Sequence, residues 1–250
     1  MIDAHCHLAF RGIVDSVVRV LADAKKSMKF VVTCGLPRDY EKTFEIAEKN
    51  EDFVFVSLGI HPEDVIEITD SDIEKNLEFI RSKSGKIVAV GEIGLDYFWV
   101  KDAAKNERCK KVFEKCLDIA EEFDLPVVLH SRKAEQDVFD IVSQRKFRSV
   151  VFHHYSGNMT LAKQIVDKGY FISLPTTTPR SNTLGKIGKT FPLQNLLTET
   201  DSPFNSPVKD EMNVPQNVEF TLGFLEKIRS QPKAEIEKII DENAKQIFQT

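Results

Sequence analysis

The chain opens with Met1-Ile2-Asp3-Ala4-His5-Cys6-His7-Leu8, a short apolar run with two histidines separated by one residue. Side chains alternate between the two faces of a β-strand, so His5 and His7 share one face and Cys6 lies on the other. Two imidazoles on one face can chelate a metal ion. The alternative is a polar strand end with two solvated histidines, and the positions of the other histidines help to distinguish the two.

Short apolar segments rich in β-branched residues recur along the chain, as in strands buried on both faces of a parallel sheet. The predicted strands are Met1–His7, Phe30–Gly35, Phe53–Gly59, Ile87–Gly91, Val127–His130, Val150–His153, Tyr170–Leu174 and Leu196–Thr200. The predicted helices are Val14–Lys25, Asp39–Asn50, Ser71–Lys83, Glu107–Phe123, Glu135–Lys146, Met159–Lys168, Leu184–Lys189, Val218–Arg229 and Ala234–Phe248.

This alternation of strands and helices predicts an α/β fold, a single-domain (β/α)8 TIM barrel over residues 1–250. A doubly wound open sheet is the alternative architecture. The glycine-rich phosphate-binding loop that is typical of such sheets is absent from the sequence. The barrel is therefore favoured.

The formal net charge of −5 argues against a broad surface for duplex DNA. It leaves room for a nuclease whose few phosphate contacts lie in a metal-centred pocket. The four cysteines form no CxxC pair, so neither a zinc finger nor a thioredoxin-like motif is expected. No apolar run is long enough to cross a bilayer, and cleavage of a signal peptide would remove His5 and His7. We therefore expect a cytoplasmic protein without a membrane partner.

All the histidines of the chain lie at the carboxyl ends of predicted strands. They are His5 and His7 in the first, His61 after the third, His130 in the fifth, and His153 and His154 in the sixth. Active sites of (β/α)8 barrels are built from this rim. The predicted fold and the histidine positions therefore support each other and favour a metal site.

Two acidic residues, Glu92 and Asp201, lie at the ends of the fourth and eighth predicted strands. An acid in this position commonly caps the following helix, which is the alternative for either residue alone. Buried carboxylates beside several imidazoles need a cation, and a divalent metal ion supplies it. Nitrogen and oxygen ligands without thiolate suit Zn²⁺, Mn²⁺, Fe²⁺ or Ni²⁺, and a carboxylate-rich subsite also suits Mg²⁺.

These residues lie in motifs that resemble those of the TatD-type metal-dependent deoxyribonucleases of the amidohydrolase superfamily. The resemblance runs along essentially the whole chain in the family's order. The matching segments are Asp3–Leu8, Gly59–Pro62, Gly91–Tyr97, Pro126–Arg132, Phe152–Gly157, Glu199–Pro203 and the closing Glu242–Phe248.

The resemblance implies a site for two divalent metal ions. By this resemblance, the ligands are His5, His7 and Asp201 for one ion, His130 and His153 for the other, and Glu92 as the bridge. The family's His-x-aromatic-Ser-Gly pattern selects His153 rather than His154 as the ligand. The implied substrate is DNA.

The ligand set suggests a mechanism for phosphodiester hydrolysis. Two ions can clamp a phosphodiester and lower the pKa of a coordinated water from ~15.7 towards ~7. We expect Asp201 to ligate weakly and to accept the water proton. We also expect His61, which lies beside the metals in this family, and Arg132 to stabilise negative charge on the phosphoryl oxygens.

Further substrate contacts are predicted less directly. Trp99 lies with Tyr97 and Phe98 at the predicted mouth, where an aromatic ring can stack on an unpaired base, although loop packing is the alternative. Arg180 and Lys209, in the loops after the seventh and eighth strands, can contact phosphate. Exposed basic residues more often have no specific role.

Two loops depart from the family pattern. A basic segment that many relatives carry after the last ligand is replaced by Lys209-Asp210-Glu211-Met212-Asn213-Val214-Pro215, which contains two acids. Pro175–Arg180 also differs. An acidic loop weakens the binding of long polyanions, so we expect short or single-stranded DNA ends rather than long duplex.

Two other functions remain open. A hydrolase of a small ester, amide or phosphoester can use the same metal site, because a metal-activated water attacks a carbonyl as readily as a phosphorus. A non-catalytic metal-binding barrel predicts tight metal binding without turnover, but it gives Asp201 and His61 no role.

Overall fold

The computed structural model describes all 250 residues, and its eight strands form one parallel sheet that follows the order of the chain. The strands are β1 (Ile2–Cys6), β2 (Phe30–Gly35), β3 (Val54–Leu58), β4 (Ala89–Asp96), β5 (Val127–Arg132), β6 (Val150–Phe152), β7 (Phe171–Leu174) and β8 (Leu196–Thr198). Nearly all strand residues are buried, as expected for apolar runs covered on both faces.

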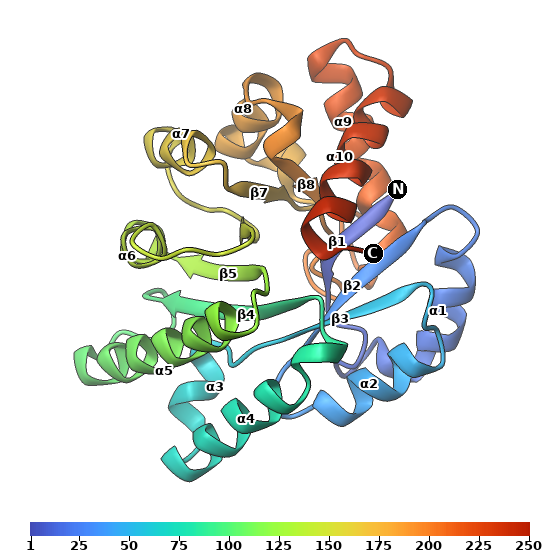
Figure 1. Cartoon of the computed structure of the whole chain (residues 1–250). Coiled ribbons are helices and arrows are strands. Elements are labelled where there is room, and N and C mark those ends of the chain that lie inside the picture. Colours follow the sequence, from blue (N-terminus) through green and yellow to red (C-terminus); the bar gives the residue numbers. More distant parts are fainter.

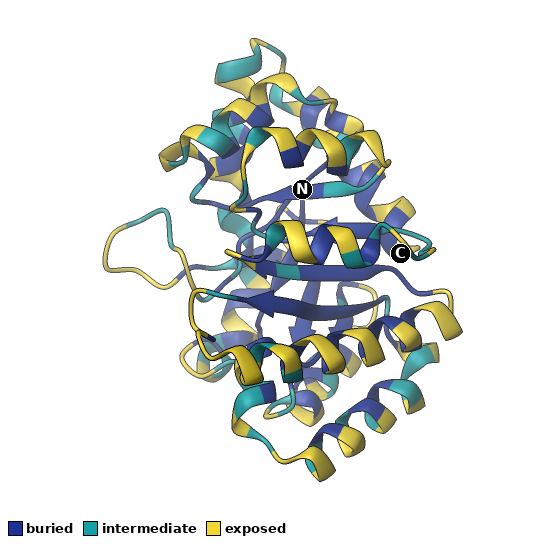
Figure 2. Cartoon of the chain, turned by 90° about the vertical axis from the view of Figure 1, so that its left-hand side faces the viewer, coloured by how far each residue is buried: buried dark blue, intermediate teal, exposed yellow.

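Helices surround the strands (Figure 1). They are α1 (Val17–Ala24), α2 (Tyr40–Glu48), α3 (Pro62–Glu67), α4 (Asp70–Ser82), α5 (Ala103–Glu122), α6 (Glu135–Val142), α7 (Met159–Asp167), α8 (Asn182–Thr190), α9 (Val218–Arg229) and α10 (Lys233–Phe248). Figure 2 shows the strands dark blue and the helices carrying their exposed residues on the outer sides. The predicted (β/α)8 barrel is confirmed. None of the helices combines the length and the apolar character needed to span a bilayer.

The barrel closes between its last and first strands through the residues that follow β8. The Asp201 amide donates to the His5 carbonyl at 2.9 Å. The buried Asp3 carboxylate accepts hydrogen bonds from the Thr200 amide at 2.9 Å and from the Thr200 hydroxyl at 2.5 Å. These bonds hold the segment that carries Asp201 beside the segment that carries His5 and His7.

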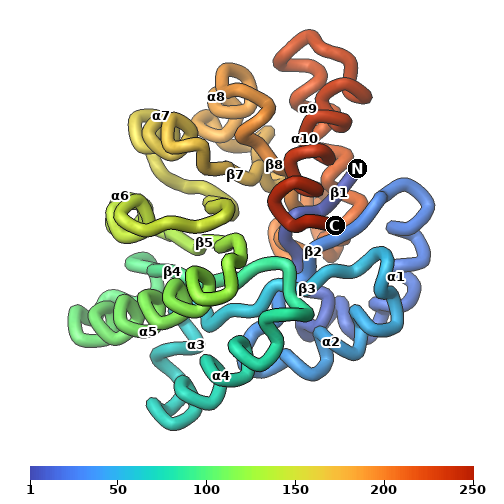
Figure 3. The backbone as a smooth tube through the Cα atoms, viewed as in Figure 1, coloured from blue at the N-terminus to red at the C-terminus, as the bar shows by residue number.

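The C-terminal helix covers the amino-terminal end of the barrel. Phe248 of α10 packs in one apolar cluster with inward-facing strand residues such as Ile2 and Val128. Figure 3 shows the last turns of α10 beside β1, with the two termini close together. The Met1 ammonium pairs with Glu237 of α10 at 2.5 Å. The carboxyl ends of the strands therefore form the opposite end.

Two strands carry irregularities that decide which side chains point into the barrel. Ile2 and Ala4 of β1 face the interior, so regular alternation would turn His5 outward. The pairing of β1 with β2 shifts register between Asp3 and Cys6. A β-bulge inserts one residue and re-aims the side chains that follow it. The bulge therefore turns His5 inward, together with His7 directly after the strand.

The fourth strand, β4, has a similar β-bulge at Glu92. Its register against β5 shifts between Gly91 and Ile93, and Ala89 before the shift faces the interior while Ile93 packs outside the barrel. Glu92 is the extra residue and points inward. In β5 and β6 the regular alternation is sufficient, whereas Asp201, in the connection after β8, takes a φ of +58°.

Near the site, one predicted boundary is wrong and one helix is missed. β4 continues to Asp96 instead of ending at Gly91, because Gly94 takes a φ of +146° beside the His130 carbonyl and lets β4 pair with β5 beyond the bulge. α3 is absent from the predicted helices because its six residues are too few to show a helical period. The other elements lie where they are predicted, with ends that differ by a few residues.

Gly59, directly after β3, packs against the backbone of Glu92. A Cβ at this position would lie 2.2 Å from the Glu92 carbonyl oxygen and 2.6 Å from its amide nitrogen. Only glycine allows the two strands to approach this closely. The position of Glu92 therefore depends on the absence of a Cβ at Gly59, directly after the neighbouring strand.

We expect Gly59→Ala to destabilise the fold by about 1–3 kcal/mol, because the added methyl group forces two strands apart. Urea unfolding measures the change in the free energy of unfolding. Gly85→Ala is the matched control, since a Cβ there meets nothing within 4 Å. Equal destabilisation by the two substitutions would contradict the packing role of Gly59.

Candidate metal centre

A cleft of about 660 Å³ opens at the carboxyl ends of the strands. Its polar lining includes His7, His61, Glu92, His130, His153, His154 and Asp201. His5 lies just beneath, fully buried. The structure thus brings together all the histidines and both acids that the sequence singles out.

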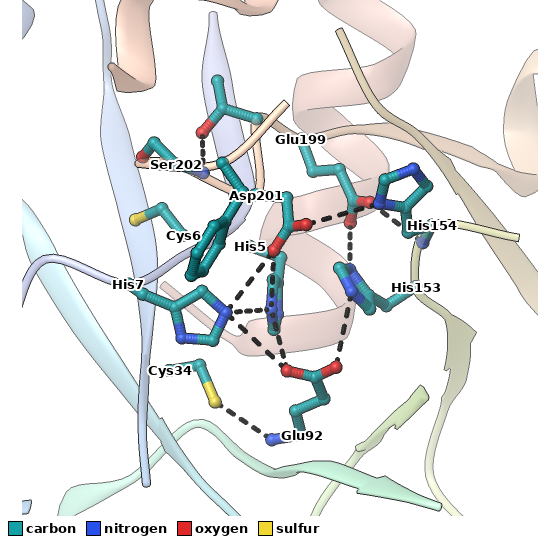
Figure 4. A network of polar contacts seen from close by, with 12 residues as sticks. His5, Cys6, His7, Cys34, Glu92, His153, His154, Glu199, Asp201 and Ser202 are labelled. Atoms are coloured by element: carbon teal, nitrogen blue, oxygen red, sulfur yellow. Dashed lines mark hydrogen bonds and ion pairs between the residues drawn. The ribbon is translucent and has the colours of Figure 1, made fainter. Parts of the chain in front are cut away.

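The two histidines of the opening segment point at the same place. His5 Nε2 and His7 Nε2 are 3.2 Å apart, and they lie 3.5 and 3.7 Å from Glu92 Oε2. Asp201 Oδ1 lies 3.9 Å from His5 Nε2 and 3.4 Å from His7 Nε2 (Figure 4). Two nitrogens and two oxygens therefore surround one point.

The other oxygen of Glu92 faces a different group of imidazoles. Glu92 Oε1 lies 2.7 Å from His130 Nδ1, 3.5 Å from His153 Nε2 and 3.6 Å from His61 Nε2. One carboxylate thus separates two sets of nitrogen ligands, with one oxygen turned to each set. This is the arrangement that a bridging carboxylate requires.

The spacings fit bound cations better than direct contacts. Most of them exceed the length of a strong hydrogen bond, yet they suit atoms that share an ion at roughly 2.0–2.2 Å from each. Cys34 lies next to this group, but its Sγ accepts from the Glu92 amide at 3.1 Å and donates to the Gly91 carbonyl at 3.3 Å. Burial raises the pKa of the Cys34 thiol, which keeps it protonated. The donor set is therefore nitrogen and oxygen.

The electrostatics of the cluster favour positive charge. Burial alone would raise the pKa of Glu92, but the surrounding imidazoles hold it well below its ordinary value. Burial opposes charge on the imidazoles too. The carboxylates nevertheless raise the pKa of His130 to about 9 and that of His153 to about 10. Protons thus take the places that metal ions would fill, and binding an ion would release them.

Two carboxylates that the sequence analysis does not single out orient these imidazoles. Asp96 Oδ2 lies 2.8 Å from His130 Nε2, and Glu199 Oε2 lies 2.9 Å from His153 Nδ1. A carboxylate on the second ring nitrogen fixes the tautomer and orientation of a ligating histidine. Glu199 lies two residues after the inward-facing Leu197 in the predicted strand Leu196–Thr200, so strand alternation could have found it. Asp96 shares a face with Glu92 only because β4 is longer than predicted.

Asp201 is held from the side opposite His5 and His7. Its Oδ2 accepts a hydrogen bond from Asn205 Nδ2 at 2.9 Å and lies 3.4 Å from His154 Nδ1. His153 faces Glu92, whereas His154 reaches Asp201 rather than the bridging carboxylate. Asp201 Oδ1 is therefore the oxygen left for the centre.

His61 presents a hydrogen-bond donor to the cleft. Its Nδ1 accepts from the Glu63 amide at 3.2 Å and caps α3, so the ring proton lies on Nε2. Burial, with the positive charge of His130 next in size, lowers the pKa of His61 to about 3. The imidazole is therefore neutral, with Nε2–H near Glu92.

Of the residues predicted to contact the substrate, one lines the cleft and two do not. Arg132 lines the cleft, and its guanidinium lies 4.0 Å from the ring centre of Phe98. Trp99 is 58% exposed and is not among the lining residues. Arg180 donates to the Pro207 carbonyl at 2.6 Å and also lies outside the lining. Arg38, which the sequence analysis does not single out, lines the cleft.

A parallel barrel with a histidine and carboxylate cluster at its carboxyl rim defines the metal-dependent hydrolase class of TIM barrels. The model of the family described as TatD related DNase matches residues 2–249. The chain therefore belongs to the TatD-related DNase family, and it is a hydrolase that acts on ester bonds.

Individual relatives are similar over nearly their whole lengths. The uncharacterized metal-dependent hydrolase MJ1582 of Methanocaldococcus jannaschii is 34% identical, over 99% of this chain and 96% of its own. The human deoxyribonuclease TATDN3 is 28% identical, over 99% and 94%. The crystal structure of the TatD homologue YjjV from Escherichia coli superimposes with a TM-score of 0.89 at 28% identity, covering 100% of this chain and 98% of that one.

We expect Asp96→Asn to lower metal affinity about 10- to 100-fold, because it removes the charge that orients the His130 ring while preserving the side-chain shape. Titration of the metal-free protein with Zn²⁺ or Mn²⁺ measures the affinity. Asp102→Asn is the matched control, since Asp102 only caps α5 through the Lys105 amide. Unchanged affinity in the Asp96 variant would contradict its orienting role.

Proposed function

We propose that this chain hydrolyses phosphodiester bonds of DNA at the rim cluster, with two divalent ions bound. The observation that carries the proposal is the pair of Glu92 oxygens, one turned to His5 and His7 and the other to His130 and His153. A single-ion site would not need a carboxylate with ligands on both sides. The relatives named deoxyribonuclease favour DNA as the substrate.

The ligands follow the geometry of the cluster. His5, His7 and Asp201 would hold one ion, His130 and His153 would hold the other, and Glu92 would lie between them. When bound, such ions act as Lewis acids on the phosphoryl group and make a coordinated water acidic enough to react at neutral pH. Zn²⁺, Mn²⁺, Fe²⁺ and Ni²⁺ suit the imidazole-rich donors, and Mg²⁺ suits the carboxylates.

Asp201 acts as the general base. Asn205 and His154 hold its Oδ2, so Oδ1 alone faces the centre and can accept the proton of the attacking water. The neighbouring imidazoles His154 and His7 hold the pKa of Asp201 well below its ordinary value despite its burial, so the carboxylate is ionised.

His61 and Arg132 stabilise the charge that develops on the phosphoryl oxygens. The Nε2–H of His61 is a neutral donor that is already oriented by the helix cap. Arg132 adds a positive charge at the mouth of the cleft, near Phe98 and Trp99. Preorganised donors of this kind lower the barrier more than flexible ones.

The charges near the cleft favour a short or single-stranded substrate. Apart from the histidines, the lining residues include two cations, Arg38 and Arg132, beside three acids. The exposed acids Asp210 and Glu211 on the connection after β8 would repel a long duplex. The four cysteines are free and buried, in keeping with the reducing cytoplasm that we propose as its location.

The same charge pattern supports a second candidate, the hydrolysis of a small ester, amide or phosphoester. The cleft offers two arginines, Arg38 and Arg132, which suit a compact substrate with one anionic group. Cleavage of end-labelled single-stranded DNA by the metal-loaded protein tests the first candidate. Full metal occupancy without DNA cleavage would favour the second.

We expect Asp201→Asn to lower kcat about 10²- to 10⁴-fold with little change in KM, because the amide cannot accept the proton. The assay uses the same labelled DNA, with metal content measured in parallel. Asp210→Asn is the matched control, since its side chain is exposed on the same connection. An intact kcat in a fully metal-loaded Asp201 variant would refute the assignment of the base.

We expect His61→Asn to lower kcat/KM about 10²- to 10³-fold, because asparagine preserves the cap of α3 but cannot reach the phosphoryl group. Thermal unfolding checks that the cap and the fold remain. Wild-type kcat/KM in this variant would show that His61 contributes only to the structure of α3.

A further inference from the structure

Two phenylalanines from opposite ends of the chain form an apolar wall of the cleft. Phe10 follows β1 and Phe204 follows β8, and both line the cleft. Their ring centres are 4.9 Å apart, with an angle of 63° between the ring planes. Phe204 also lies edge-on to His7, with ring centres 5.9 Å apart. The wall is therefore in contact with a residue of the metal cluster.

The position of Phe204 is fixed relative to the catalytic carboxylate. Its amide donates to the Asp201 carbonyl at 2.9 Å, and its own carbonyl accepts from Asn213 Nδ2 at 2.7 Å. The buried Asn213 also donates to the Thr200 carbonyl at 2.8 Å. Phe204 is nevertheless 41% exposed. A rigid backbone thus holds a large apolar ring in water at the site.

The charged groups beside this apolar wall indicate which kind of ligand it would bind. The Arg38 guanidinium lies 5.3 Å from the centre of the Phe10 ring, so a positive charge borders the apolar surface. The metal cluster lies on the other side, next to His7. A flat, uncharged ring attached to a phosphate matches this sequence of apolar, cationic and metal-binding surfaces.

We propose that Phe10 and Phe204 form a platform on which the nucleobase next to the scissile phosphate stacks. Aromatic side chains bind unpaired bases in this way without regard to sequence. Phe98 does not line the cleft, and the Arg132 guanidinium lies over its ring at 4.0 Å from the ring centre. The inference rests on the proposed function for the position of the phosphate.

Binding of nucleotide products tests the platform without any cleavage step. Titration calorimetry measures the affinity of the Zn²⁺-loaded protein for thymidine 5′-monophosphate and thymidine 3′-monophosphate. Each is compared with the corresponding 1,2-dideoxyribose phosphate, which carries the phosphate at the same position but lacks the nucleobase. We expect the base to tighten binding of at least one pair about 5- to 150-fold, the range that one stacked base supplies. Phe204→Leu and Phe10→Leu should each reduce this ratio towards one.

Phe123→Leu is the matched control. Phe123 directly follows α5, at the opposite end of the barrel, and its exposed fraction of 37% resembles that of Phe204. This variant should keep the wild-type ratio. Circular dichroism and Zn²⁺ content confirm that each variant is folded and loaded.

The outcomes separate the platform from the proposed function. Equal affinities with and without the base in the wild type, or an unchanged ratio in Phe204→Leu, would overturn the platform even if DNA is cleaved. A base-dependent ratio that Phe204 and Phe10 control would support the platform even if no DNA is cleaved, and the proposed phosphodiesterase activity alone would then fail.

Discussion

The structure depends on one buried negative charge, the carboxylate of Glu92. Removing a carboxylate from water is costly unless cations and hydrogen bonds surround it. Here imidazoles approach both oxygens, and the Glu92 amide is satisfied by Cys34. Because Gly59 has no Cβ, the backbone of Glu92 can pack closely against it. The rim is therefore arranged around a charge that only cations can stabilise, whether these are protons on histidine or metal ions.

The two ends of the barrel interior differ: the amino-terminal ends of the strands contribute apolar packing, and the carboxyl ends carry the polar residues of the site. At the amino-terminal end, residues such as Ile2 and Val128 build an apolar plug with the last turn of α10. At the carboxyl end, the inward positions are polar. In β5 and β6 the change occurs within one step of the strand alternation, from Val128 to His130 and from Val151 to His153. The same faces that stabilise the fold thus lead directly to the metal cluster.

Much of this arrangement is predictable from sequence because it is local. Continuous apolar runs identify the strands, and alternation places His130 and His153 on the inner face. The bulges in β1 and β4 are not predictable in this way, because they depend on the register against the neighbouring strands. The orienting role of Asp96 depends on the extension of β4 beyond its bulge. Trp99 and Arg180 stay predictions as substrate contacts.

Closure of the barrel brings together residues from the two ends of the chain. The hydrogen bonds of Asp3 to Thr200 hold the connection that carries Asp201 beside β1. The same connection continues to Phe204, and the segment after β1 continues to Phe10. The proton acceptor Asp201 and the proposed stacking platform for the nucleobase are therefore positioned by one set of buried contacts. A shift at this junction would move the proton acceptor and the stacking surface together, so the alignment of the phosphate with its neighbouring base is a property of the closed barrel rather than of a mobile loop.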